Sequence, residues 1–230
     1  MTSDVTIVAL AGGGIAAPFK EIAAQFEATF GHKVAIRFGT TPQLIKMAAD
    51  GPFDLAVVPV DVFSDSPTRA LFEPGPTLDV ARVGIGVAVR SGAAKPDIGT
   101  PEALKRTLLE AQAVASIPAS STGTLLAGIY EGLGIAEEMQ AKTRAQPGPA
   151  QIAEAVVKGE ADLAVFLTNV LTDPRLDLVG SFPAEIQRDV IYQAGFAANS
   201  KEPDIAKAFI AYLLSPEGAA VIKSKGMIPG

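Results

Sequence analysis

The amino-acid sequence predicts an α/β protein of two lobes, each a mainly parallel sheet flanked by helices, with a cleft between them. Apolar runs of strand length alternate with helical patterns from residue 5 to residue 58, which is typical of β-α-β units. The same alternation starts again after a long apolar stretch at residues 81–90. We therefore expect residues 1–82 plus 195–230 to form lobe I and residues 83–194 to form lobe II.

Three glycines join the first expected strand of lobe I to its first helix. Residues 5–10 form an apolar run, Gly12, Gly13 and Gly14 follow it, and residues 15–26 show a helical pattern. Glycines let backbone N–H groups approach a ligand closely, and a helix start carries a partial positive charge. An anion fits such a turn, although a tight turn without any ligand explains the glycines equally well. The spacing matches neither the dinucleotide fingerprint nor the P-loop.

The next two turns of lobe I also place polar residues after strands. Thr40 and Thr41 follow an expected strand at residues 34–38 and precede an expected helix at residues 43–49. One threonine is a natural N-cap, which would leave the other hydroxyl for a ligand. Asp61 follows the third expected strand, and carboxyl ends of parallel strands share the edge where ligands bind. Asp61 is therefore a candidate at that edge, with a turn or cap role as the alternative.

Lobe II is expected to repeat this arrangement. Gly84 and Gly86 favour a bend or bulge in the strand at residues 81–90, which we expect to cross between lobes. Two further helix starts carry small or hydroxyl residues: Ser120, Ser121, Thr122 and Gly123 at one, and Pro149 and Ala150 at the other. Together with the two turns of lobe I, they indicate an enclosed anion held by hydroxyl and N–H groups.

The remaining elements follow from periodicity and from turn residues. Further helices are expected near residues 68–72, 101–111, 124–133, 137–142, 150–158, 205–214 and 217–225, and further strands at residues 113–117, 143–146, 162–167, 176–182 and 191–199. The last of these strands is expected to return the chain to lobe I.

The composition excludes several kinds of function. A net charge of −6 argues against nucleic acid as a partner. The chain has no cysteine and one histidine, His32, which we interpret as a turn residue, so we expect no metal site and no cofactor. No apolar stretch reaches the ~18 residues of a membrane span. Residues 1–4 lead straight into a strand, so we expect a periplasmic protein if a signal peptide has been removed and a cytoplasmic one otherwise.

Several segments resemble the periplasmic substrate-binding proteins of molybdate-type ABC transporters, a family with the type II periplasmic-binding fold. The resemblance covers essentially the whole chain. Besides Phe26, the matching segments are FGTTPQL at 38–44, FDLA at 53–56, VKGEADL at 157–163, AFIAYLLSPEG at 208–218 and KGMIP at 225–229. The resemblance implies a monomeric solute-binding protein that captures a small anion in the cleft for ABC-type uptake, with a transporter membrane subunit as a partner.

The resemblance also assigns positions to the anion site. The family's oxyanion contacts fall on Gly14, Thr41, Thr122, Pro149 and Phe166. Thr41 and Thr122 keep the expected chemistry, whereas Gly14 has no hydroxyl, Pro149 has no N–H and Phe166 has no phenol hydroxyl. Each missing donor to a desolvated oxyanion would cost about 1–3 kcal/mol. We therefore expect an organic carboxylate rather than molybdate as the ligand.

An enzyme is the alternative function. The family looks to include aconitate isomerase-like members, which share the fold but move a proton on a tricarboxylic acid. Such chemistry needs a general base within reach of the substrate, and Asp61 is the best carboxylate candidate because His32 is badly placed. No acid–base pair stands out, so binding is preferred over catalysis. A one-lobed effector domain of a transcription regulator is disfavoured, because no helix-turn-helix segment precedes the fold.

Overall fold

A computed structural model describes residues 5–230, so residues 1–4, on which the expectation about a signal peptide rests, lie outside the described residues. The chain divides into unit 1, Met1–Arg82 with Ile191–Gly230, and unit 2, Val83–Val190. Both boundaries fall inside strands, because β4 spans Leu78–Arg90 and β9 spans Asp189–Phe196. Each unit combines a sheet with flanking helices, so the predicted α/β fold is confirmed.

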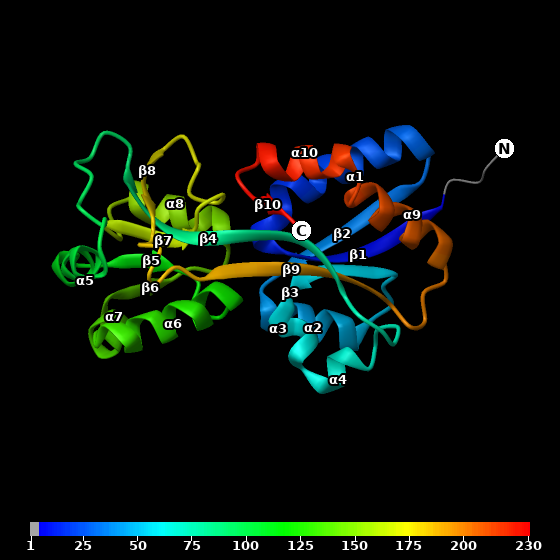
Figure 1. Cartoon of the computed structure of the whole chain (residues 1–230), viewed down its shortest axis with the longest axis horizontal. Helices are drawn as coiled ribbons and strands as arrows, with labels where there is room; N and C mark the ends of the chain where they lie inside the picture. Colours follow the sequence, from blue (N-terminus) through cyan, green and yellow to red (C-terminus); the bar gives the residue numbers. More distant parts are fainter. Residues whose placement is uncertain (1–4) are drawn as a thin grey trace. The chain divides into compact units, whose positions relative to one another are not determined.

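Unit 1 contains a sheet whose strands follow the order β2-β1-β3-β9 (Figure 1). The first three are parallel, β9 runs antiparallel to β3, and β10 pairs with the unit 1 end of β4. The bounds are β1 Thr6–Gly12, β2 Lys33–Gly39, β3 Leu55–Pro59 and β10 Ile228–Pro229 for the strands, and α1 Ala16–Phe30, α2 Thr41–Asp50, α3 Val60–Ser64, α4 Ser66–Arg69, α9 Pro203–Leu213 and α10 Pro216–Ser224 for the helices.

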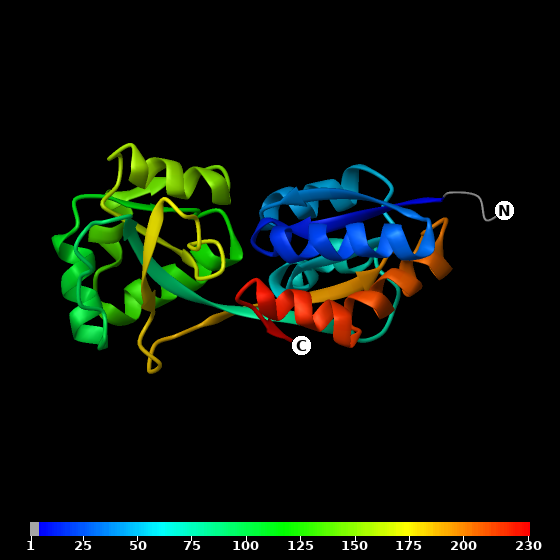
Figure 2. The ribbon, with the colours of Figure 1, turned by 90° about the horizontal axis from the view of Figure 1, so that it is seen from above.

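Helices cover both faces of the unit 1 sheet, α1, α9 and α10 on one and α2, α3 and α4 on the other (Figure 1). On the first face the ring of Phe209 packs edge-on against Phe19 and Phe26, with centroid distances of 5.4 and 5.2 Å. Figure 2 shows α1, in blue, beside α10, in red. Within residues 5–230, no single helix has both the length and the apolar character to cross a membrane; α9 and α10 meet that criterion only as a pair, bent by 59°.

Unit 2 contains a sheet whose strands follow the order β4-β7-β5-β6, with β8 also paired to β4. Strands β5, β6 and β7 are parallel, and β4 runs antiparallel to β7. The bounds are β5 Val114–Ser116, β6 Thr143–Ala145, β7 Leu163–Leu167 and β8 Leu176–Ser181 for the strands, and α5 Pro101–Glu110, α6 Ser121–Leu133, α7 Ala136–Lys142 and α8 Pro149–Val157 for the helices.

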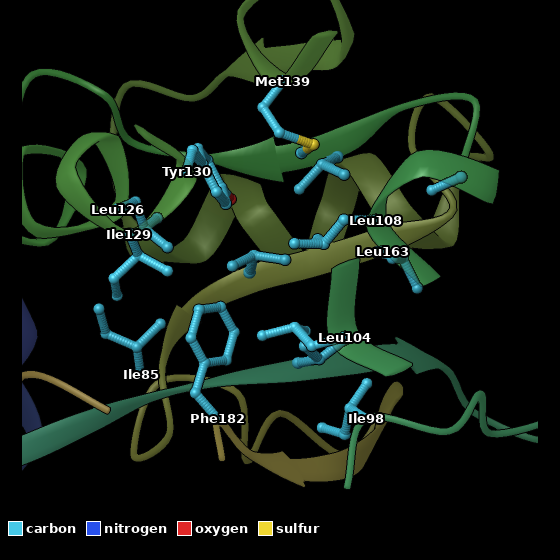
Figure 3. Close-up of a cluster of buried hydrophobic side chains, with 14 of the residues drawn as sticks. Ile85, Ile98, Leu104, Leu108, Leu126, Ile129, Tyr130, Met139, Leu163 and Phe182 are labelled. Atoms are coloured by element: carbon cyan, nitrogen blue, oxygen red, sulfur yellow. The ribbon is translucent and has the colours of Figure 1, made fainter. Parts of the chain in front are cut away.

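The core of unit 2 lies between one face of this sheet and the helices α5, α6 and α7 (Figure 3). Leu104 and Leu108 reach it from α5, and Leu126 reaches it from α6. Helix α8 contacts β5, β7 and β8 and buries Ile152 and Val156. Both faces of β7 are therefore covered, which explains why all five of its residues are buried.

The expected helix at residues 68–72 is wrong in position. Two short helices occur instead, α3 directly after β3 and α4 before residue 70. Asp65 starts α4 early, because its Oδ2 accepts hydrogen bonds from the N–H of Thr68 at 3.0 Å and from the Thr68 hydroxyl at 2.5 Å. Asp61 lies in the first turn of α3, which directly follows β3, rather than in an open loop.

Candidate functional site

The parallel register of unit 1 brings the predicted residues of lobe I to one edge of the sheet. Gly12 at the end of β1 pairs with Gly39 at the end of β2, and Ala11 pairs with Val57 of β3. The polar residues after these strands therefore share that edge. We call this group the first cluster; it comprises Gly12, Gly13, Gly14, Thr40, Thr41, Asp61 and Tyr192.

The three glycines form a tight structure rather than an open loop. Gly12 ends β1, and a 3₁₀ turn at Gly13–Ile15 leads directly into α1. A Cβ atom on Gly12 would lie 2.7 Å from Cε1 of Tyr192 and 3.1 Å from Cδ of Pro59. At this position glycine is needed because an aromatic ring packs against the backbone, so Gly12 is no evidence for an anion.

The two threonines at the start of α2 have different roles. Thr40 is the N-cap residue, and its N–H donates to Oε1 of Gln43 at 2.9 Å. Thr41 is the first helical residue, and its hydroxyl Oγ1 donates to Oδ2 of Asp61 at 3.2 Å. The hydroxyl predicted to remain for a ligand is therefore bonded to a carboxylate. The first cluster thus presents a hydroxyl together with a negative charge.

Tyr192 belongs to the first cluster but was not predicted from the sequence. It lies in β9 opposite Pro59, and only 2% of its surface is exposed. Burial, and secondarily the charge of Asp61, raises the pKa of the Tyr192 hydroxyl. The phenol therefore stays protonated and is able to donate a hydrogen bond. The available signal was the strand expected at residues 191–199, because it returns the chain to lobe I and Tyr192 lies at its start.

In unit 2, the predicted residues also follow parallel strands. Ser116 at the end of β5 pairs with Ala145 at the end of β6, and β5 is also parallel to β7. Helices α6 and α8 begin just beyond β5 and β6, so their first turns share one edge of this sheet. We call this group the second cluster; it comprises Ser120, Ser121, Thr122, Gly123, Pro149, Ala150 and Asn169.

The start of α6 is fixed by its cap. Ser120 Oγ accepts a hydrogen bond from the N–H of Gly123 at 3.1 Å and donates to the carbonyl of Ile117 at 2.6 Å. A Cβ atom on Gly123 would lie 2.1 Å from the carbonyl oxygen of Pro118, so this position requires glycine. Thr122 is buried, with 2% of its surface exposed. Ser120, Thr122 and Gly123 therefore shape the helix start, whose first N–H groups point out along the axis.

The other predicted residues of unit 2 lie in different environments. Pro149 is the first residue of α8 and Ala150 the second, and Gly148 is the N-cap. Phe166 lies inside β7 with 3% of its surface exposed, so its ring is part of the buried strand. Asn169, which was not predicted, follows β7 and reaches the same edge as the starts of α6 and α8. A polar residue directly after a buried strand was the signal that could have identified it.

The two clusters supply N–H and hydroxyl donors but no cationic side chain. Neither contains lysine or arginine, and the first contains the carboxylate of Asp61. Helix starts and hydroxyls can hold an anion without a buried cation. Among residues 5–230, no group of three or more His, Asp or Glu side chains is placed to hold a metal ion.

Comparison with known proteins connects this geometry to a family. Residues 7–228 match the family described as bacterial extracellular solute-binding protein. The chain is 29% identical to an aconitate isomerase of Pseudomonas sp. over 97% of this chain and 88% of that protein. It is 27% identical to the molybdate-binding protein ModA of Azotobacter vinelandii over 91% of this chain and 84% of that protein.

Solved structures with low sequence identity share the fold. The periplasmic molybdate-binding protein of Azotobacter vinelandii superposes with a TM-score of 0.79 at 17% identity, covering 96% of this chain and 98% of that chain. The sulfate-binding protein SubI of Mycobacterium tuberculosis gives a TM-score of 0.77 at 17% identity, covering 98% of this chain and 87% of that chain. The resemblance predicted from the sequence is confirmed, and the chain belongs to the family of bacterial extracellular solute-binding proteins.

Proposed function

We propose that this protein captures a small organic carboxylate, rather than molybdate, for uptake by an ABC-type transporter. The extracellular description of the family favours the periplasmic location over the cytoplasmic one. In unit 1 we propose anion contacts through Thr41 and the turn at Gly12–Gly14, and in unit 2 through the helix starts at Ser120–Gly123 and at Pro149.

The hydrogen bond from Thr41 to Asp61 carries the proposal on ligand class. A fully deprotonated oxyanion such as molybdate accepts hydrogen bonds but donates none, and it is repelled by the Asp61 carboxylate. An organic acid with a hydroxyl or a protonated carboxyl group can replace this bond with two: its charged end accepts from the Thr41 hydroxyl, and its own hydroxyl donates to Asp61 in place of Thr41. Pro149, which has no N–H, removes a further donor from the helix start of α8.

Ligand-induced stabilisation of the folded protein tests this proposal. A ligand that binds only the native state raises stability by RT ln(1 + [L]/Kd), so a thermal scan ranks ligands without labels. We expect malate or citrate, each of which carries a hydroxyl group, to raise Tm more than equal concentrations of molybdate or sulfate. A larger rise with molybdate than with every carboxylate would contradict the proposal.

Variants at two residues of the first cluster test whether Thr41 and Asp61 contact the ligand. Thr41→Val is expected to weaken carboxylate binding several-fold, because the Thr41 hydroxyl is proposed to turn from Asp61 to the ligand and a lost hydrogen bond to a charged ligand costs about 1.5 kcal/mol or more. Asp61→Asn is expected to increase the affinity for molybdate about fivefold, because it relieves a repulsion of about 1 kcal/mol between the carboxylate and the anion. Thr29→Val is the matched control, because the exposed Thr29 hydroxyl only donates to the carbonyl of Gln25. Equal effects of Thr29→Val and Thr41→Val would remove Thr41 from the site.

An isomerase remains the second candidate function, and two observations favour it. One relative is named an aconitate isomerase, and Asp61 lies close enough to Tyr192 to influence its pKa. A carboxylate and a protonated phenol could serve as base and acid. If the protein were an isomerase, trans-aconitate would take up deuterium from D₂O, and Asp61→Asn would lower that exchange by roughly 10²-fold. We expect the ligand to be recovered without deuterium.

A further inference from the structure

The hydroxyl group of Tyr192 is a hydrogen-bond donor that the fold leaves unused. Only 2% of the residue is exposed, and its hydroxyl has no hydrogen-bond partner among residues 5–230. Buried oxygen atoms without a partner occur in the described chain at Ser116 and Tyr130, but the Tyr192 oxygen is not one of these enclosed atoms. The ring is therefore packed, whereas the hydroxyl keeps access to the space beside the sheet. Since most buried polar groups have a partner, an unused donor at this place indicates a ligand.

The packing of the ring directs this hydroxyl to the sheet edge that carries the first cluster. Tyr192 pairs with Pro59, the last residue of β3, and Asp61 follows Pro59 by two residues. A Cβ atom on Gly12 would lie 2.7 Å from Cε1 of the ring but 3.5 Å from Cδ1. Cε1 adjoins the carbon that carries the hydroxyl. The hydroxyl end of the ring therefore lies beside the end of β1, where the turn into α1 begins.

The surroundings of the hydroxyl suit a donor that is directed at an anion. The turn at Gly13–Ile15 leads into α1, a helix of 15 residues, and the start of such a helix carries a partial positive charge. Burial raises the pKa of Tyr192, and the charge of Asp61 adds to this effect, so the phenol keeps its proton. A helix start alone does not define a site. Here it lies beside a protonated hydroxyl without a partner, which can form a strong hydrogen bond to a charged acceptor.

We propose that Tyr192 is a ligand-contact residue whose hydroxyl donates a hydrogen bond to the anionic group of the bound solute. The identity of this group, a carboxylate, rests on the proposed function. A carboxylate has two oxygen atoms, so it can accept from Tyr192 and from Thr41 together, while the hydroxyl of the solute donates to Asp61. Because these three residues share one sheet edge, the carboxylate and the hydroxyl of the solute must lie close together, as they do in malate.

NMR of the full chain tests the contact without assuming which anion binds. The chain contains three tyrosines, so labelling tyrosine with ¹³C at Cζ, the carbon that carries the hydroxyl, gives three signals. Tyr130→Phe, Tyr192→Phe and Tyr212→Phe assign them, and malate and molybdate are the probes. We expect saturating malate to shift the Tyr192 signal and to leave the Tyr212 signal unchanged, because Tyr212 lies in α9 and donates to Oε1 of Gln25 at 3.2 Å.

Calorimetric titration of variants measures what the Tyr192 hydroxyl contributes. Tyr192→Phe removes an unpartnered hydroxyl, so the urea midpoint should not fall, but malate should bind roughly tenfold more weakly through loss of a hydrogen bond to a charged group. Succinate, which is malate without its hydroxyl, should lose the same factor, so the preference for malate over succinate should persist. Asp61→Asn should reduce that preference instead. Tyr212→Phe is the matched control and should bind malate with wild-type affinity.

The outcomes separate this contact from the proposed function. If molybdate alone binds and shifts the Tyr192 signal, the proposed ligand class fails, whereas the contact between Tyr192 and the bound anion is supported. If malate binds equally well to the wild type and to Tyr192→Phe, the proposed function stands and the Tyr192 contact is overturned. A Tyr192 signal that stays fixed at high concentrations of both probes would also overturn the contact.

Discussion

The ring of Tyr192 leaves no space for a side chain at residue 12, so this position favours glycine. A glycine run before a helix is often taken as a sign of anion binding, but the position of this ring explains Gly12 by packing alone. The charge of Asp61 contributes to the raised pKa of the same residue, and the Asp61 carboxylate accepts a hydrogen bond from the Thr41 hydroxyl. Tyr192 therefore links the packing of this sheet edge to the chemistry of the first cluster.

Gly12→Ala tests this packing role. The new methyl group would meet a fully packed ring, and we expect a loss of about 1–3 kcal/mol in the free energy of unfolding, measured by urea denaturation. Gly128→Ala is the matched control, because residue 128 lies inside α6 with nothing within 4 Å of an added Cβ. The control should gain about 0.5–1 kcal/mol from helix propensity. A Gly12→Ala protein as stable as the wild type would mean that Tyr192 does not constrain residue 12.

Glu27 gives unit 1 a defined dependence on pH. The N–H of Val34 donates to its carboxylate at 2.9 Å and is the largest cause of a lowered pKa; desolvation partly opposes this effect, and the ion pair with Lys33 at 3.2 Å adds to it. A carboxyl group whose pKa is lower in the folded state stabilises the protein above its unfolded-state pKa. That stability is lost as the pH falls through the folded-state pKa.

Glu27→Gln should therefore reduce the pH dependence of stability. We expect the difference in unfolding free energy between about pH 7 and about pH 3 to be smaller in the variant than in the wild type, because one linked carboxyl group is gone. Urea denaturation at both pH values measures this difference. An identical difference in both proteins would show that the contact with Val34 does not persist in solution.

At the scale of elements, the start of α6 combines a structural cap with a proposed contact. Ser120 caps this helix through Gly123, just as Thr100 caps α5 through the N–H of Ala103 at 3.1 Å. Removing either cap exposes an unpaired N–H and should cost about 1 kcal/mol. The two helices differ in that only α6 begins within the second cluster.

Ser120→Ala and Thr100→Ala separate these two roles. Both variants should lower the urea midpoint by a similar amount. Ser120→Ala should also lower the affinity for the organic anion several-fold, because the first turn of α6 loses its fixed position. Thr100→Ala should bind the anion with wild-type affinity. Calorimetric titration of both variants gives the comparison, and equal affinities would exclude the start of α6 from the site.

The elements were more predictable than the contacts among their side chains. The strand–helix alternation, the N-caps at Thr40 and Thr100 and the left-handed glycine at Gly31, with φ of 76°, all follow from local rules. Helix α6 begins at Ser121, before the expected start at residue 124, because Ser120 caps it. The bond from Thr41 to Asp61 joins residues that are twenty positions apart and could not be predicted from local patterns. Tyr192 was missed for the same reason, because it reaches the first cluster from β9, far along the chain.

At the scale of the whole molecule, family membership establishes a solute-binding protein but leaves its solute open. Relatives of similar identity are named for an isomerase of an organic acid and for a molybdate-binding protein. The choice between these ligand classes therefore depends on local chemistry, above all on the carboxylate of Asp61 in the first cluster. A negative charge at this position favours a ligand that can donate a hydrogen bond as well as accept one.

Isothermal titration calorimetry of the purified full-length chain is the most direct test of this choice. Molybdate, malate and citrate are titrated separately into ligand-free protein, with trans-aconitate, which has no hydroxyl group, as a further carboxylate. We expect at least one carboxylate to bind at least tenfold more tightly than molybdate, a difference of about 1.4 kcal/mol or more. Submicromolar affinity for molybdate, with weaker or undetectable binding of every carboxylate, would contradict the proposed ligand class.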